Sequence, residues 1–268
     1  MKKLLKLALC LLTVALLAES CSSVAFTGRK RVLMYTDDQI SALADESYNE
    51  FESTAKPSTN KTYTNMVQQV GKRMTSALEN YLRSIGQEDY LSGLKWNYEL
   101  VQSNEVNAFC LPNGKIVFYE GLMKYTNTPD YIAVVMGHEI AHAVARHGNE
   151  RMSQQSMLST AGSVLGAVVG MKTGSTGQAI FESAFGIGSQ YGLLLPYSRQ
   201  HEYEADKIGL IIMAMAGYDV DQAPIFWEKM TEGSSSSTPE LLSTHPSDAN
   251  RIKKIMEVIP EAKSYIGK

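Results

Sequence analysis

The strongest constraint on the fold is the run His138-Glu139-Ile140-Ala141-His142, which lies inside an apolar segment. Small and apolar residues flank the run from Ile132 to Val144, as expected for a helix that is buried on most of its circumference. Residues four apart share one face of an α-helix, so the two imidazoles can bind a single zinc ion. Glu139 is rotated by about 100° from His138 and can reach a water molecule at the metal. Because buried polar groups need partners, we favour a metal site over two satisfied core histidines.

A second helical segment, from Ser198 to Ala216, carries the candidate third ligand. Glu202 and Asp206 are four residues apart on a face that leads into the apolar side of this helix. Two histidines and one glutamate leave a fourth position on zinc for water, which is typical of hydrolytic sites. We assign Glu202 as the third ligand, and Asp206 as the acceptor of the other ring N–H of a ligand histidine. His201 is a rival ligand, and Glu204 is expected to be solvated.

With these motifs the chain resembles the M48 metallopeptidases, the gluzincins that include the CAAX prenyl endopeptidase, the heat-shock protease HtpX and the mitochondrial Oma-type enzymes. The matching motifs span the chain from about Thr36 to Ile255 and are His138-Glu-x-x-His142, Ser198-Arg-x-x-Glu202-x-x-Ala205-Asp206, Asn107-Ala-Phe-x-x-Pro112-x-Gly114, Ala145-Arg-His147-x-x-Glu150-Arg151 and Thr244-His245-Pro246-Ser247. The resemblance implies a zincin-like metalloprotease domain. The sequence shows no run of transmembrane helices, so it is similar to the periplasmic, lipoprotein-type branch of the family.

The remaining polar motifs leave alternatives open. His245 follows the Gly/Ser-rich stretch 233–238. A mobile loop there can bring His245 to the zinc, where it stabilises the oxyanion or occupies the open metal position and switches the enzyme off. A structural role at the start of the last helix is the alternative. Arg251, one turn into that helix, is a candidate contact for the substrate backbone or the tetrahedral intermediate. For His147 and Glu150-Arg151 we favour a helix-terminal histidine and a surface ion pair over a part in catalysis.

Two segments rich in β-branched and aromatic residues, Trp96–Val101 and Lys115–Tyr119, predict strands. Pro112-Asn113-Gly114 between them is typical of a turn. Zinc endopeptidases generally bind an extended peptide as an added strand on a sheet edge. We expect the segment Asn107-Ala108-Phe109 to be that edge, with an ordinary small meander as the alternative.

The rest of the chain predicts mostly helix, so the expected fold class is α+β, mainly helical, with a small β-sheet flanking the H-E-x-x-H helix. Thr36–Asp45 and Tyr63–Ile85 have apolar residues at helical spacing. Between the two metal helices, Met157–Tyr191 is rich in Gly, Ala and Ser. It predicts either a helical hairpin that packs against the active-site helix or a lid over the cleft.

The N-terminus predicts export and lipidation. Residues 1–20 combine two lysines with the apolar core Leu4–Ala18, as in a bacterial lipoprotein signal peptide. We expect acylation of Cys21 in preference to soluble release, so that residues 21–35 form a lipidated tether and residues 36–268 the zinc metallopeptidase domain. The serine after the cysteine favours the outer membrane, facing the periplasm.

These observations predict a zinc-dependent endopeptidase with one zinc ion per chain. Zinc lowers the pKa of its bound water and polarises the scissile carbonyl, and Glu139 takes the water proton and delivers it to the leaving amine. The resemblance implies unfolded or misassembled envelope polypeptides as substrates, with the membrane reached through the lipid anchor. The net charge of −3 and the lack of a basic tract argue against a nucleic-acid partner.

Two alternatives remain. One is a chaperone-like envelope-assembly lipoprotein with latent proteolysis, which the loop at His245 keeps open. The other is a zinc amidase acting on cell-wall peptides, for which no wall-binding segment is visible. Glu139 favours the enzyme, because a pure binding module has no need of a base.

Overall fold

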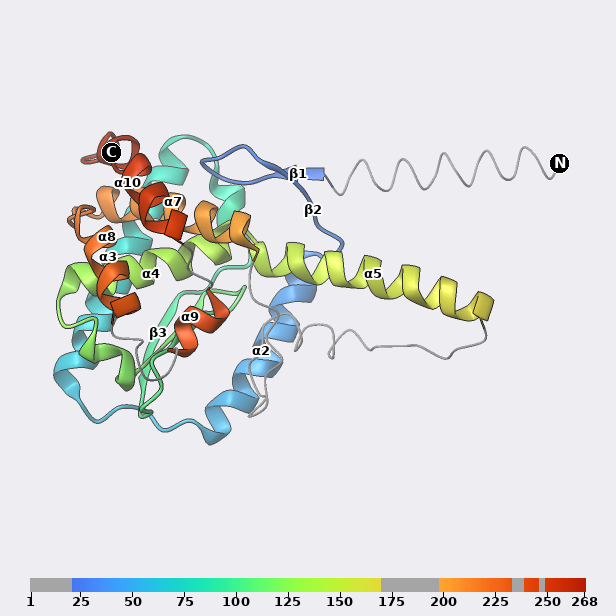
Figure 1. Ribbon diagram of the computed structural model, residues 1–268, viewed down its shortest axis with the longest axis horizontal. Coiled ribbons are helices and arrows are strands. Elements are labelled where there is room, and N and C mark those ends of the chain that lie inside the picture. The colour runs from blue at the N-terminus through green and yellow to red at the C-terminus, as the bar shows by residue number, and fades with distance from the viewer. Residues whose placement is uncertain (1–20, 170–197, 233–238, 246–248) are drawn as a thin grey trace.

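Helices make up most of the chain that the computed structural model describes, which is residues 21–169, 198–232, 239–245 and 249–268 (Figure 1). They are α2 (Asp37–Thr54), α3 (Lys61–Ser84), α4 (Pro129–Val144), α5 (His147–Val169), α7 (Arg199–Met215), α8 (Gln222–Glu232), α9 (Glu240–Thr244) and α10 (Ala249–Lys263), with short 3₁₀ helices at Glu88–Leu91 and Glu120–Lys124. The two expected amphipathic helices correspond to α2 and α3, and the mainly helical α+β fold is confirmed.

A small sheet lies beside α4 and has its own edge strand. It consists of β3 (Asn97–Val101), β4 (Ala108–Cys110) and β5 (Lys115–Tyr119). The strand order is β3-β5-β4, with β5 parallel to β3 and antiparallel to β4. Gly114 closes the turn between β4 and β5 at a φ of 88°, which favours glycine. Both expected strands are present, and within the described residues β4 is an edge strand in contact with α4.

Two glycines set the distance between α4 and α7, the pair of elements with the most extensive mutual packing among those described. A Cβ atom added to Gly137 would lie 2.9 Å from the carbonyl oxygen of Gly209, and one added to Gly209 would lie 2.8 Å from the carbonyl carbon of Gly137. Neither position accepts a side chain unless the helices move apart. Because Gly137 directly precedes His138, this close approach brings the polar faces of the two helices together.

Residues 21–32 differ from the expected polar tether, and we call them the N-terminal strap. In the strap, β1 (Cys21–Ser23) pairs antiparallel with β2 (Lys30–Val32). Val24 and Ala25 between the strands are each 1% exposed and belong to the main hydrophobic core. The strap is drawn in blue in Figure 1, and its strand β2 contacts α5. Residues 21–32 therefore pack against the domain through buried apolar side chains, and the lipidation expected for this tether stays a prediction.

Two expectations concern residues outside the described part of the chain. These are the signal peptide at 1–20 and most of the hairpin or lid at 157–191. Up to Val169 the latter segment continues α5, which extends away from the other helices in Figure 1. Among the described helices, none has both the length and the apolar character that crossing a membrane requires.

Candidate metal centre

The two histidines of the H-E-x-x-H run lie one turn apart on α4. The side chain of Thr128 caps this helix by accepting a hydrogen bond from the amide of Tyr131, with Pro129 in the first turn. His138 and His142 are both buried among the apolar residues of α4. Buried imidazoles need polar partners, and those partners come from the neighbouring helices.

Glu202 reaches the same point from the first turn of α7. Ser198 caps α7 by accepting a hydrogen bond from the amide of His201. Glu202 is 0% exposed, although it carries a carboxylate. Removing a carboxylate from water is costly unless cationic or polar groups compensate it. Nη1 of Arg251 lies 3.4 Å from Oε2 of Glu202, and the other groups around this carboxylate are imidazoles.

Four possible ligand atoms, from His138, His142, Glu202 and His245, converge within 4.8 Å of one another. Nε2 of His138 lies 3.0 Å from Nε2 of His142 and 3.3 Å from Oε2 of Glu202. Nδ1 of His245, just after α9, lies 3.1 Å from Nε2 of His138 and 3.1 Å from Oε1 of Glu202. Ligand atoms about 2.0–2.1 Å from zinc in a tetrahedron are roughly 3.3–3.4 Å apart. The observed separations are close to that value.

Two buried carboxylate oxygens in this cluster support the same conclusion. Oε1 of Glu139 and Oε2 of Glu202 are buried, and neither has a hydrogen-bond partner among the described residues. Imidazole nitrogens and a carboxylate oxygen are ligand types that zinc prefers. The donor set therefore fits a zinc ion.

Glu139 lies beside these donors and is itself almost fully buried. Burial raises the pKa of Glu139, whereas the charges of His245 and His138 and a hydrogen bond from the backbone N–H of Cys110 act in the opposite direction. Oε1 of Glu139 is 3.4 Å from Nε2 of His245. A carboxylate next to the metal donors, without a ligand position of its own, can exchange a proton there.

Asp206 and Arg251 form the support of His138. Nδ1 of His138 lies 2.9 Å from Oδ1 of Asp206. The guanidinium of Arg251 binds both Asp206 oxygens, at 2.8 and 2.9 Å, and stacks on the ring of Trp227. It also donates to the carbonyl oxygen of His245 at 3.2 Å. Arg251 is 0% exposed, and its Nη1 also lies 3.4 Å from Oε2 of Glu202. The expected contact of Arg251 with substrate stays a prediction.

His142 has a different support. Nδ1 of His142 lies 2.9 Å from Nδ1 of His147, and Nε2 of His147 lies 2.9 Å from Oε2 of Glu204. Both His147 and Glu204 are buried. Burial lowers the pKa of His147 to about 4 against the effect of Glu204, so the ring is neutral at pH 7.

The structure corrects the expectations for two glutamates near this row of side chains. Glu204 is buried and therefore not solvated. Glu150 is also buried, and it forms two hydrogen bonds to Arg29 of the strap instead of a surface ion pair.

The rival ligand His201 lies away from the donor cluster. Its ring stacks on that of His147, with centroids 4.5 Å apart, and its Nε2 is 3.3 Å from Oε2 of Glu150. His201 is not among the four residues whose ligand atoms converge.

The main chain of β4 alternates between β5 and the outer edge. Asn107 and Leu111 hydrogen-bond to β5 through their main chains, and Phe109 pairs with β5 between them. Because main-chain groups alternate along a strand, those of Ala108 and Cys110 face the outer edge. β4 packs against α4, the helix that carries Glu139 and two of the metal donors. Of the three residues expected to bind substrate, Ala108 is the one whose main chain faces that way.

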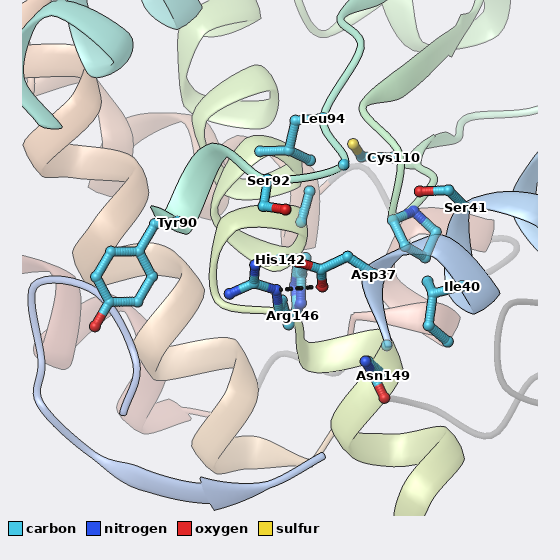
Figure 2. Close-up of a pocket in the computed structure, with 14 residues that line it drawn as sticks. Asp37, Ile40, Ser41, Tyr90, Ser92, Leu94, Cys110, His142, Arg146 and Asn149 are labelled. Atoms are coloured by element: carbon cyan, nitrogen blue, oxygen red, sulfur yellow. Dashed lines mark hydrogen bonds and ion pairs between the residues drawn. The ribbon is translucent and has the colours of Figure 1, made fainter. Parts of the chain in front are cut away.

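A small surface hollow lies on the side of His142 away from the donor cluster. Its lining includes Cys110, His142 and Tyr90, and an ion pair between Arg146 and Asp37 lies across it (Figure 2). The hollow therefore lies between the end of β4, at Cys110, and the metal-donor residue His142.

A model of peptidase family M48 matches residues 68–259. The chain belongs to this family. Members of family M48 are metallopeptidases that use zinc, in agreement with the donor set.

The relatives of this M48 chain include mitochondrial and bacterial proteases. It is 35% identical over 209 residues to the mitochondrial metalloendopeptidase OMA1 of Schizosaccharomyces pombe, a match that covers 75% of this chain and 59% of that protein. It is 38% identical over 168 residues to OMA1 of Arabidopsis thaliana, covering 63% and 32%. It is 29% identical over 184 residues to the beta-barrel assembly-enhancing protease of Escherichia coli (strain K12), covering 65% and 37%. The chain thus spans 32–59% of the length of these relatives.

Sequence reasoning did not find the roles of Arg29, Gly137 and Gly209. Nothing near Arg29 in sequence marks it, because its carboxylate partners lie 121 and 175 residues away. The two glycines did carry a signal. A glycine inside a helix costs about 0.5–1 kcal/mol relative to alanine, so a glycine within an apolar helix indicates close packing.

Proposed function

We propose that the protein is a zinc-dependent endopeptidase that cleaves polypeptides, with zinc held by His138, His142 and Glu202. The convergence of these three donors next to Glu139, at separations that suit one tetrahedral ion, carries the proposal. Family membership supports it, because it rests on residues 68–259, which include every proposed ligand.

The proposed mechanism gives each side chain a separate task. A zinc ion bound here supplies a Lewis acid that activates a water molecule and polarises the scissile carbonyl. Glu139 accepts the proton of that water and later delivers it to the leaving amine. Oε1 of Glu139 is buried and has no hydrogen-bond partner among the described residues, so it is available to accept that proton. Asp206 fixes the orientation of the His138 ring through Nδ1.

The substrate is proposed to bind as an added strand on β4. The main-chain groups of Ala108 and Cys110 face the outer edge, and their carbonyl oxygens can accept hydrogen bonds from an extended peptide. The Ala108 N–H, which donates to Oδ1 of Asn107 at 2.9 Å, would exchange that partner for the substrate. Such binding requires an unfolded segment, because a strand within a folded protein already has its partners. The hollow beside His142 lies at the end of this strand and is proposed to receive a substrate side chain.

His245 is proposed as a removable fourth ligand that holds the enzyme in a latent state. Its Nδ1 occupies the fourth donor position of the cluster, which a catalytic site leaves open. The segment before it also covers the substrate edge, because Leu241 of α9 donates a hydrogen bond to the carbonyl of Val106, next to the proposed edge segment. Movement of α9 and His245 together would free the metal position and expose the start of this edge.

The proposed setting is the cell envelope. Residues 1–20 have the features of a lipoprotein signal peptide, and acylation of Cys21 would anchor the protein to the outer membrane, facing the periplasm. The E. coli relative is a beta-barrel assembly-enhancing protease, so we propose misassembled envelope polypeptides as the substrates.

The second candidate is a chaperone-like assembly factor whose proteolysis is held off. The four-donor arrangement favours it, because a site closed by His245 can retain a bound polypeptide without cutting it.

The test uses the full-length chain in detergent, with zinc per chain and cleavage of unfolded casein measured for the wild type, Glu139→Gln and His245→Ala. The endopeptidase predicts one zinc in all three, no cleavage by Glu139→Gln and faster cleavage by His245→Ala. A chelator should abolish cleavage by the wild type, and added zinc should restore it. One zinc without cleavage in any form would favour the assembly factor, and absence of zinc would refute the site.

A further inference from the structure

The metal-donor residue His142 faces a second histidine where His138 faces a carboxylate. Nε2 of His142 lies among the donors, and its Nδ1 is 2.9 Å from Nδ1 of His147. Nε2 of His147 is 2.9 Å from Oε2 of Glu204. The three side chains form a buried row that begins at the donor cluster and ends at a carboxylate.

Only one arrangement of protons satisfies this row when a metal is bound. A His142 that binds through Nε2 carries its proton on Nδ1, and this N–H needs an acceptor. Nδ1 of His147 must then be unprotonated, so its proton is on Nε2, which donates to Glu204. The carboxylate at one end and the metal at the other together select one tautomer of each ring.

The N-terminal strap holds the carboxylate end of the row. Nε of Arg29 donates to Oε2 of Glu204 at 2.8 Å, and the hydroxyl of Thr27 donates to Oε1. The two Nη atoms of Arg29 bind both oxygens of Glu150 on α5, at 2.8 and 2.7 Å. Arg29 therefore joins α5 and α7 behind His147. A charge-assisted network of this kind restricts the position of Glu204 more than a single bond does.

We propose that His147 is a positioning residue for the metal ligand His142, and that the N-terminal strap completes this support through Arg29 and Glu204. The proposal rests on the zinc site proposed above and deepens it. It makes the strap, which follows the proposed signal peptide, a contributor to zinc affinity through Glu204 and His147.

The first test compares two substitutions of His147 in the full-length chain. His147→Leu removes the acceptor, and zinc affinity, measured by competition with a chelator, should fall by about 10- to 100-fold. His147→Gln keeps a side-chain carbonyl that can accept the His142 N–H and should recover most of the affinity. The absorption spectrum of the cobalt(II) form should change in His147→Leu and stay close to wild type in His147→Gln. A merely structural role would lower the melting temperature of both metal-free variants without separating their metal affinities.

The second test does not depend on the folding of His147→Leu. Arg29→Met and Glu204→Gln should each weaken zinc binding by about threefold to tenfold. Because both act through the same contact, the loss of zinc affinity in the double variant should equal the larger of the two single losses. Arg83→Met is the matched control, because Arg83 pairs with Glu79 on the surface of α3. Its zinc affinity should equal that of the wild type.

The outcomes separate this inference from the proposed function. If the wild type binds one zinc and the Leu, Gln and Arg29 variants bind it equally tightly, the positioning role is refuted and the zinc site stands. Fully multiplicative losses in the Arg29–Glu204 double variant would refute the coupling of the strap to the row. A wild type that binds no zinc would refute both.

Discussion

Each metal-donor histidine of α4 is backed by a carboxylate of α7, and each carboxylate is held by an arginine, but the arginines come from opposite ends of the chain. Asp206, behind His138, is held by Arg251 of α10. Glu204, on the side of His142, is held by Arg29 of the strap. The side chain of Arg251 is 0% exposed and that of Arg29 is 18% exposed.

The support of His138 and the support of His142 also differ in the number of side chains between the arginine and the metal donor. Asp206 contacts His138 directly, whereas Glu204 acts through His147. A fully buried ion pair whose carboxylate contacts the donor histidine directly should be rigid and costly to break. A partly exposed pair with an added imidazole should be easier to perturb. The comparison suggests that zinc affinity can be adjusted from the His142 side without unfolding the domain.

The largest expected effect is that of Arg251→Met. It leaves Asp206 buried without its arginine, so the free energy of unfolding of the metal-free chain should fall by about 3–5 kcal/mol. Urea denaturation at pH 7 measures it. A loss of unfolding free energy smaller than that of Arg29→Met would contradict the proposal that the support of His138 is the more costly one to break.

Arg29→Met should have the next largest effect. It removes charge-assisted hydrogen bonds to Glu204 and Glu150, so the same measurement should show a loss of about 1.5–3 kcal/mol. The control Arg83→Met breaks an exposed pair and should change stability by about 0.5 kcal/mol or less. Equal losses in the two variants would mean that the strap pairs behave as surface pairs.

Gly209→Ala tests the close packing of α4 on α7, which positions both donor histidines against Glu202. The added methyl group would lie 2.8 Å from the Gly137 backbone, so α4 and α7 must separate, and the free energy of unfolding should fall by about 1–3 kcal/mol. Zinc affinity should fall as well, because Glu202 moves with α7. Gly209→Ser should be less stable than Gly209→Ala. Unchanged zinc affinity in both would show that the spacing of the helices does not set the donor geometry.

The smallest effect is a pH dependence on the strap side. Burial alone would raise the pKa of Glu150, but the hydrogen bonds from Arg29 and His201 outweigh it and lower this pKa to about 2, from 4.5. A lowered folded-state pKa means that the contribution is complete above pH 4.5 and is lost as the pH falls toward 2. The stability difference between wild type and Arg29→Met should therefore shrink over this range. A constant difference would contradict the assignment of Arg29 to Glu150.

The helical spacing of the sequence predicted the part of the site that lies on two helices. His138 and His142 are four apart, as are Glu202 and Asp206, and the structure brings the first three together with Asp206 behind His138. The positions of β3, β5 and the main helices also followed from local patterns.

The rest required contacts that no local pattern encodes. The local pattern predicts that Glu204 is exposed on its helix, because its partner Arg29 is 175 residues earlier in the chain. Val24 and Ala25 are too few to predict from sequence that the strap packs on the domain, yet both are buried in its core. The sequence alone also does not show that Arg251 binds Asp206 and stacks on Trp227.

The most direct test of the donor set is X-ray absorption at the zinc edge of the full-length chain. The four-donor arrangement predicts only nitrogen and oxygen ligands, with three imidazoles in the wild type and two in His245→Ala. Three imidazoles that persist in His245→Ala, or any sulfur ligand, would contradict the assignment of His138, His142, Glu202 and His245 as the metal centre.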